Sequence, residues 1–338
     1  MLKMNRLYIM LLLCIFAGSN LLSQNTNRKG ERYRALKDST RILNDSLRML
    51  QDSLIRIETR QKPDTGSVNP IKETAQRLIG SMFGESRQLS NADSLIREFD
   101  RMPSFGIYRD NYFIVGSEIF KKSDEYNSDA KFQVSIRQRL TNSTLPFKTH
   151  LYLTYTQKAF WDVFRESFPF RDLNFNPGIG IGRPLVHNNR FMGMLSFEFE
   201  HESNGKDGDA SRSWNKITLG SLLTFNDNWA LQAKAWVPIV DGENNKHITS
   251  YSGLGLIALS YMSPKSKYNA SFVFTKRAGA FFDGNVLINF SVRLFSDDNQ
   301  YLFLEYYNGY GESMLQFDQY RQRVRLGIVI RPNFFSIY

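Results

Sequence analysis

Apolar and polar residues alternate with a period of two over most of the chain from Tyr108 onward. In the clearest segments, Phe, Val, Ile, Leu, Trp or Ala alternate with mainly polar side chains; these are residues 132–136, 229–237, 286–294 and 324–330. Successive side chains of a β-strand point to opposite faces. Each segment therefore predicts a strand with one apolar and one mainly polar face.

The number and spacing of these segments predict an all-β fold, a twelve-stranded antiparallel transmembrane β-barrel. About twelve segments have roughly the ten-residue length of a membrane strand, and they start near residues 108, 130, 149, 173, 191, 213, 229, 250, 267, 285, 300 and 321. Short connections alternate with longer ones at 158–172, 202–212, 239–249, 277–284 and 309–320. Short periplasmic turns and long outer loops are typical of outer-membrane barrels.

The polar face of the strands repeatedly carries Lys, Arg and Gln. This favours a wet barrel lumen, because the interior of a soluble barrel would be apolar. Residues 334–338 read Phe-Phe-Ser-Ile-Tyr after an alternating strand. A terminal aromatic residue in that place is typical of barrels that the outer-membrane assembly machinery inserts.

The first part of the chain has a different pattern. Residues 1–23 read as a secretory signal peptide, with Lys3 and Arg6 before a short apolar run. Residues 24–104 are polar and predict a helical periplasmic extension, with a linker at 63–70 and a second helical stretch at 71–99. Within it, apolar residues fall at heptad spacing at positions 36, 43, 47, 50, 54 and 57. This spacing fits a short coiled coil or a solvated amphipathic helix equally well. Residues 105–338 form the predicted barrel domain.

Composition agrees with a membrane barrel and excludes other classes. The chain has 27 Phe and 16 Tyr, which suits aromatic girdles. A mean hydropathy of −0.38 argues against a bundle of transmembrane helices. The net charge is +10, but the basic residues are spread along the chain, so no nucleic-acid partner is expected. The single cysteine, Cys14, lies in the signal peptide, so no disulfide framework is expected.

Four polar residues interrupt the lipid-facing side of the predicted strands. His201 and Ser203 continue the apolar face that precedes them on one strand, and Asn215 shares the apolar face of the next strand. Gln157 continues the apolar face of an earlier strand. Uncompensated polar groups on a lipid-facing surface cost free energy, so this cluster predicts a functional site.

The residue types in the cluster are those of a hydrolase. A serine hydroxyl needs an adjacent base to become a nucleophile, and His201 lies two residues from Ser203 on the same face. The imidazole in turn needs a third group to fix its tautomer, and Asn215 can accept from it. Gly205 offers a backbone N–H for an oxyanion hole. The other histidines, His150, His187 and His247, are interpreted as surface residues.

Two other classes compete with this interpretation. A non-enzymatic porin or adhesin barrel would direct His201, Ser203 and Asn215 into the lumen or the loops. A soluble serine hydrolase is disfavoured because the chain has no Gly-x-Ser-x-Gly elbow.

The chain resembles the outer-membrane phospholipase A family. The resemblance covers residues 105–338 and is carried mainly by the run His-x-Ser-Asn-Gly…Ser-Arg-Ser-Trp-Asn at 201–215, with shorter matches at 155–157, 167–174 and 310–313. It implies hydrolysis of phospholipid acyl esters in the outer membrane. Ser203 would be the nucleophile, His201 the base and Asn215 the orienting residue, supported by Gln157.

The resemblance also implies a calcium ion and a homodimer with the site at the subunit interface. The calcium ligands would be Ser211, the carbonyl of Lys206, and Ser167 of the other subunit. The chain departs from the family at Gly208, where an acidic residue is usual. Asp207 or Asp209 could replace it, although both are equally well explained as part of a solvated acidic loop.

Overall fold

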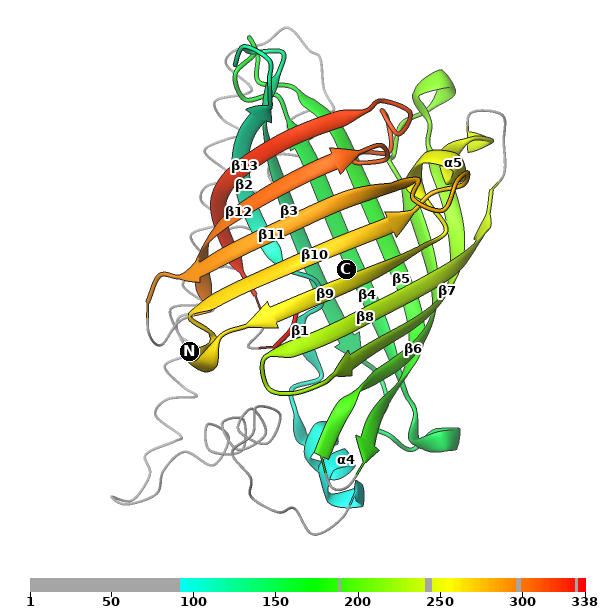
Figure 1. Cartoon of the computed structure of the whole chain (residues 1–338). Helices are drawn as coiled ribbons and strands as arrows, with labels where there is room; N and C mark the ends of the chain where they lie inside the picture. The colour runs from blue at the N-terminus through cyan, green and yellow to red at the C-terminus, as the bar shows by residue number, and fades with distance from the viewer. Residues whose placement is uncertain (1–91, 188–189, 241–244, 296–298, 332–333) are drawn as a thin grey trace, which may run out of the picture. The chain divides into compact units, whose positions relative to one another are not determined.

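The computed structural model describes residues 92–187, 190–240, 245–295, 299–331 and 334–338 (Figure 1). The signal peptide, the heptad segment, the linker and the first part of the second helical stretch lie outside these residues. The rest of that stretch forms the helix α4, Ala92–Arg101.

The described residues hold thirteen strands in one antiparallel sheet, and twelve of them, β2 to β13, close into a barrel (Figure 1). Each of these strands pairs with its neighbours in the chain, and β13 pairs with β2 to close the ring. The strands are β1 Phe105–Ile107, β2 Asn111–Glu118, β3 Ser128–Arg139, β4 His150–Trp161, β5 Phe170–His187, β6 Arg190–Ser203, β7 Ser213–Thr224, β8 Trp229–Ile239, β9 Gly255–Met262, β10 Tyr268–Lys276, β11 Gly284–Arg293, β12 Gln300–Gly309 and β13 Arg321–Ile330. The predicted fold class and strand number are confirmed. The strand expected near residue 250 begins later, because Ile248–Ser252 form the short helix α5.

The extra strand β1 results from a bulge. Both β1 and β2 pair with β3, with Ile107 opposite Ile136 and Tyr112 opposite Gln133. Residues 108–111 therefore face only residues 134–135, so the extra residues bulge out of the ladder. They project into the lumen, where the Tyr108 hydroxyl donates to Glu198 at 2.9 Å.

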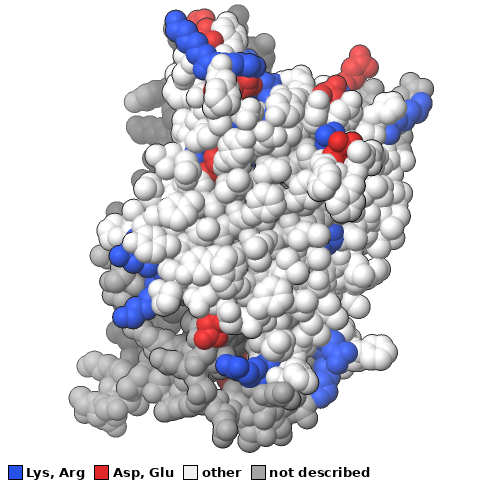
Figure 2. Space-filling view, viewed as in Figure 1, with Lys and Arg blue, Asp and Glu red and all other residues white. Residues whose placement is uncertain are grey.

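The two faces of the barrel wall have opposite polarity. Large apolar side chains such as Phe197, Leu219, Ile257 and Leu326 are exposed on the outer face. Figure 2 shows the charged side chains gathered toward the two ends of the barrel, with a mostly uncharged band between them. The lumen, in contrast, contains buried Lys, Arg, Asp and Glu side chains. No helix among the described residues is long and apolar enough to cross a membrane.

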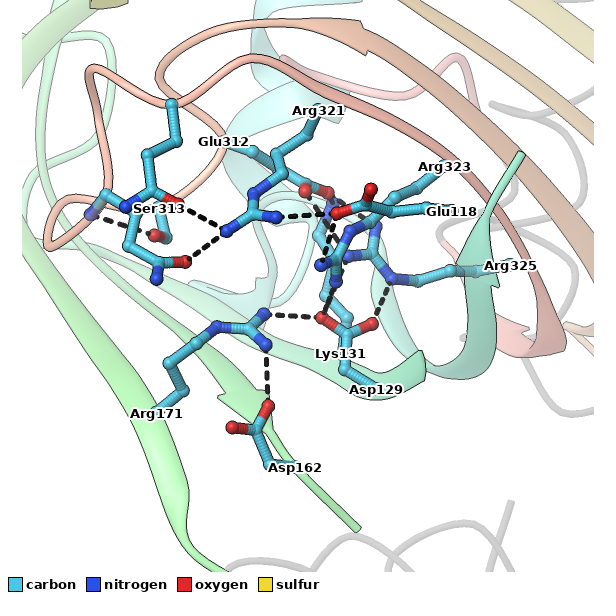
Figure 3. Close-up of polar contacts among 12 residues, drawn as sticks. Glu118, Asp129, Lys131, Asp162, Arg171, Glu312, Ser313, Arg321, Arg323 and Arg325 are labelled. Atoms are coloured by element: carbon cyan, nitrogen blue, oxygen red, sulfur yellow. Dashed lines mark hydrogen bonds and ion pairs between the residues drawn. The ribbon is translucent and has the colours of Figure 1, made fainter. Parts of the chain in front are cut away.

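A network of ion pairs fills the lumen near its outer end (Figure 3). The Asp129 carboxylate on β3 accepts from Arg325 Nε at 2.8 Å and from Arg171 Nη2 at 2.5 Å, and it also pairs with Arg323. Asp129 is completely buried. Because its partners come from β5 and β13, the network ties together parts of the wall that are far apart in sequence.

The loop between β12 and β13 folds into the same region. Its Glu312 pairs with Arg325 at 2.5 Å and with Lys131 at 3.3 Å. The backbone N–H of Met314 donates to Asn174 on β5. Met314 and Phe317 pack with Trp214 and Ile248 in a small apolar cluster. The loop thereby closes part of the outer mouth.

Helix α4 packs at the opposite end of the barrel. Arg139, the last residue of β3, donates to the carbonyl oxygens of Phe99, Asp100 and Met102 around the C-terminus of α4. A basic side chain there satisfies carbonyl groups that the helix leaves unpaired. The Phe99 ring lies 5.0 Å from the ring of His150. His150 is buried, so its interpretation as a surface residue was wrong.

Residues 334–338 turn into the lumen. Phe335 packs on Leu222, Ala230 and Met262. The Tyr338 hydroxyl bonds with Ser271, and the Tyr338 N–H donates to Gln232 at 3.0 Å. The side chains of Phe335 and Tyr338 thus lie in the barrel interior.

Candidate active site

The candidate residues lie where β6 and β7 meet the loop at residues 204–212. In the register of this pair, His201 is opposite Asn215 and Ser203 is opposite Ser213. Glu198 and Glu200 on β6 are buried in the lumen, whereas Phe197 and Phe199 are exposed. Since side chains alternate along a strand, His201, Ser203 and Asn215 point outward.

The His201 imidazole is hydrogen-bonded to Asn215. Its Nδ1 atom lies 2.9 Å from Asn215 Oδ1, across the two strands. With the amide oxygen as acceptor, Nδ1 carries the proton and Nε2 has a free lone pair. A second asparagine, Asn176 on β5, donates to the backbone carbonyl of His201 at 2.9 Å. The ring is thus held through both its side chain and its backbone in a form that can act as a base.

Ser203 lies on the same face, two residues from His201. Among the described residues no hydrogen bond joins the Ser203 hydroxyl to the imidazole. Residues two apart on a strand have Cα atoms roughly 7 Å from each other. Catalytic hydrogen bonds are often long in the absence of substrate, so the spacing is compatible with a nucleophile and its base.

Gln157 is on the outward face but apart from Asn215. It is opposite Phe175 on β5, which is in turn opposite Ser203 on β6. Two strand spacings put Gln157 roughly 10 Å from Ser203. The Gln157 amide oxygen accepts from the Tyr155 hydroxyl at 3.2 Å. The structure thus brings His201 and Asn215 together and leaves Gln157 at the edge of the cluster.

Asn204 organises the loop that follows Ser203, a role that the sequence analysis missed. Its side chain is buried. The amide oxygen accepts from the N–H of Arg212 at 2.9 Å and of Lys206 at 3.3 Å, and the amide nitrogen donates to the carbonyl of Ala210 at 2.9 Å. An asparagine before a glycine is a turn signal that could have indicated this role.

Gly205 occupies a position that favours glycine. Its φ is +64°, in the left-handed region. A Cβ atom there would also lie 3.1 Å from the Phe175 ring. A substitution at Gly205 would therefore displace the loop directly beside Ser203.

The candidate calcium ligands lie in two outer loops. Lys206, Asp207 and Asp209 are exposed, and Ser211 is half-buried at the end of the 204–212 loop. Neither aspartate carboxylate has a hydrogen bond or ion pair among the described residues. No group of three or more His, Cys, Asp or Glu side chains in the described ranges could hold a metal. Backbone carbonyl, hydroxyl and unengaged carboxylate oxygens are nevertheless the donors that a hard cation prefers, so these residues fit calcium.

Ser167 lies apart from that loop in sequence. It is in the connection between β4 and β5, exposed, with φ +66°. Lys206 Nζ donates to the carbonyl of Arg171, which is on β5 just after the loop that contains Ser167, at 3.0 Å. The described residues do not place Ser167 itself in contact with Ser211 or the Lys206 carbonyl.

A closed antiparallel barrel with a charged lumen, an apolar outer face and a His-Asn pair on that face defines an outer-membrane barrel with a hydrolase-like site. The family model for phospholipase A1 matches residues 85–330. A phospholipase A1 of Proteus vulgaris is 30% identical over 261 residues, which cover 71% of this chain and 86% of that protein. The chain therefore belongs to the phospholipase A1 family, and it is an enzyme of the bacterial outer membrane.

Solved structures agree on the fold. The outer membrane phospholipase A of Escherichia coli superposes with a TM-score of 0.59 at 24% identity, covering 68% of this chain and 94% of that one. The Salmonella typhi outer membrane phospholipase, a dimer with bound calcium, superposes with a TM-score of 0.61 at 23% identity, covering 74% of this chain and all of that one, 100%.

Proposed function

We propose that this barrel hydrolyses acyl esters of phospholipids at the outer leaflet of the outer membrane, with Ser203 as nucleophile, His201 as base and Asn215 as orienting residue. The observation that carries the proposal is the hydrogen bond between His201 Nδ1 and Asn215 Oδ1 on the lipid-facing side of the wall. An ester bond of a lipid in the outer leaflet can reach this face without leaving the membrane.

The tautomer of His201 determines the path of the serine proton. Because Asn215 Oδ1 accepts a hydrogen bond from Nδ1–H, Nε2 is free to take the proton of the Ser203 hydroxyl as the serine oxygen attacks the ester carbonyl. The same proton then passes to the leaving alcohol, and a water repeats the sequence to release the fatty acid. A neutral amide beside the imidazole avoids an ionised carboxylate against lipid, at the cost of weaker stabilisation of the imidazolium ion.

The negative charge on the ester oxygen needs a stabilising group. The Gly205 N–H is the backbone donor beside Ser203. A calcium ion held by Ser211, the Lys206 carbonyl and Asp207 or Asp209 would supply further electrophilic stabilisation when bound. Asn204 supports this function indirectly, because it fixes the path of the loop that carries these oxygens.

We further propose that the active form is a homodimer in which Ser167 completes the calcium site of the other copy. The support is that Ser167 is exposed and has no contact with Ser211 of its own chain. A related protein from Salmonella typhi is described as a dimer with bound calcium. Gln157 would then support the site from within the dimer interface.

Lumen geometry disfavours the porin or adhesin alternative. His201, Ser203 and Asn215 point away from the lumen, contrary to what that alternative requires. The lumen also holds the ion-pair network around Asp129 and residues 334–338.

The first test is phospholipid hydrolysis by the refolded protein in detergent, with calcium and with chelator. Ser203→Ala is expected to lower the rate by roughly a thousandfold or more. Ser213→Ala is the matched control, since Ser213 lies directly opposite Ser203 on the same face and should retain activity. A folded Ser203→Ala protein that stays active would contradict the assignment of the nucleophile. Full activity in chelator would contradict the calcium requirement.

Mixed dimers test the role of Ser167. Ser203→Ala and Ser167→Ala proteins are each expected to have little activity alone. If Ser167 acts on the other copy, mixing them before refolding creates one complete site in each mixed dimer and restores about a quarter of the wild-type rate. Mixtures that stay inactive, although cross-linking shows mixed dimers, would place Ser167 in its own chain's site or outside the mechanism.

A further inference from the structure

Two adjoining cavities lie in the lumen, outside the candidate active site. Their volumes are about 160 and 200 Å³. Arg109, Lys158 and Tyr338 line both, and Lys234 lines the first. The hydroxyl-bearing residues Ser252, Thr275 and Ser313 also face the first cavity.

Cationic side chains that line the first cavity have nitrogen atoms without a hydrogen-bond partner among the described residues. Lys234 on β8 is only 7% exposed, and its Nζ atom has no hydrogen-bond partner among the described residues. Its nearest aromatic ring, that of Tyr108, has its centroid 5.8 Å away. The Nε atom of Arg109 is also buried and unpartnered. Lys158 Nζ makes no ion pair or hydrogen bond to any described residue.

Nearby carboxylates do not pair with Lys158 or Lys234 among the described residues, because other donors already engage them. Glu312, which also lines the first cavity, pairs with Arg325 and Lys131. Glu198 accepts from the hydroxyls of Tyr108 and Tyr152, at 2.9 and 2.8 Å. Glu200 accepts from Arg109 Nη2 and from a threonine.

Glu202 accepts from Lys216 at 3.0 Å and from Trp214 at 3.0 Å. The lysines of the lumen thus fall into two groups. Lys131 and Lys216 have carboxylate partners within 3.0 Å, whereas Lys158 and Lys234 have none in the described ranges.

A buried ammonium group without a counter-charge is costly, so it loses its proton unless an anion supplies the missing charge. The first cavity, of about 160 Å³, has room for several waters, each of which takes about 30 Å³ in the liquid, and therefore also for a small anion. We infer that the first cavity is a binding site for a small inorganic anion held between Lys158, Lys234 and the Arg109 Nε–H. This site is independent of the proposed catalytic chemistry, since its residues face the lumen.

Diffraction from crystals of the whole protein soaked in sodium bromide tests the site directly, because bromide has an anomalous signal. The expected result is a bromide peak in the first cavity within hydrogen-bond distance of Lys158 or Lys234. Sodium phosphate soaks form a second arm, which shows whether an oxyanion also enters. A cavity that contains only water in both arms would overturn the inference.

Thermal unfolding in detergent provides a second test. It is monitored by the change in electrophoretic mobility between the folded and the heat-unfolded barrel. Ionic strength is held constant by using the bulky anion gluconate in the reference buffer in place of bromide or phosphate. Relative to gluconate, bromide or phosphate should raise the unfolding temperature of the wild-type protein. Lys234→Met should abolish this increase. Lys122→Met, at an exposed loop position, is the matched control and should retain it. An unfolding temperature that responds to the anions equally in all three proteins would also overturn the inference.

Discussion

The two sides of the barrel wall use polar residues in different ways. In the lumen, Asp129, Arg323 and Arg325 are completely or almost completely buried, and each has several ion-pair partners from other strands. On the lipid-facing side, the side chains of His201 and Asn215 make one hydrogen bond within the described part of the chain, and it joins them to each other. Exposed apolar residues such as Phe199 and Ile217 surround them.

This difference distinguishes polar residues that stabilise the fold from polar residues that serve function. A lumen charge with several partners contributes to the fold, because its removal leaves those partners unpaired. A polar residue facing lipid gains little for folding and is retained at a cost. Lumen substitutions should therefore change stability more than activity, and substitutions on the lipid-facing side should do the reverse.

The largest expected effect is on stability, at Asp129. Asp129→Asn removes the charge that Arg171, Arg323 and Arg325 share, and should lower the free energy of unfolding by about 3–5 kcal/mol. Activity per folded protein should change little. Denaturant unfolding from detergent or lipid measures the first quantity, and phospholipid hydrolysis at low temperature measures the second.

Asp318→Asn is the matched control for this prediction. Asp318 is an exposed acid in the β12–β13 loop, so its loss should leave both quantities close to wild type. If Asp129→Asn were as stable as this control, the lumen network would have no structural role, and the comparison between the two faces would fail.

A smaller effect, now on activity, is expected at Asn215. Asn215→Ala removes the acceptor for the His201 Nδ1 proton, and a hydrogen bond to a group that becomes charged is worth about 1.5–3 kcal/mol, or roughly a tenfold to hundredfold loss in kcat. Asn215→Asp retains an acceptor and should recover most of the rate. Stability should stay within about 0.5 kcal/mol of wild type for both variants. An equal loss of rate in both variants would mean that Asn215 does not act through the imidazole.

The strand pattern and the outward direction of the site could be predicted from sequence for a common reason. Because side chains alternate along a strand, the position of Phe197 and Phe199 on the outer face determines that of His201. The same rule could have placed His150 in the lumen, because it shares its face with Tyr152.

Other features depend on contacts that no local pattern encodes. Arg325 and Asp129 are separated by 196 positions in the chain, and their pairing follows from barrel closure. The bulge that directs Tyr108 toward Glu198 interrupts the alternation, so the period of two does not predict which way the side chains of residues 108–111 point. The inward turn at Phe335 and Tyr338 is set by lumen shape, which the sequence does not describe.

The smallest expected effect is a pH dependence at Glu312. Burial raises the pKa of this carboxyl, but Arg325 and Lys131 outweigh burial and hold the pKa well below the ordinary value of 4.5. In the unfolded chain the group therefore binds its proton at higher pH than in the folded one. Its contribution to the free energy of unfolding is complete above about pH 4.5 and is lost as the pH falls toward the folded pKa, by at most about 1.4 kcal/mol per pH unit.

Glu312→Gln should be less stable than the wild-type protein at pH 7, and its stability should depend less on pH between about pH 4.5 and pH 3. Unfolding midpoints of the two proteins across that interval test this, and parallel curves would show that other carboxylates, such as Asp129, account for the acid sensitivity of the lumen.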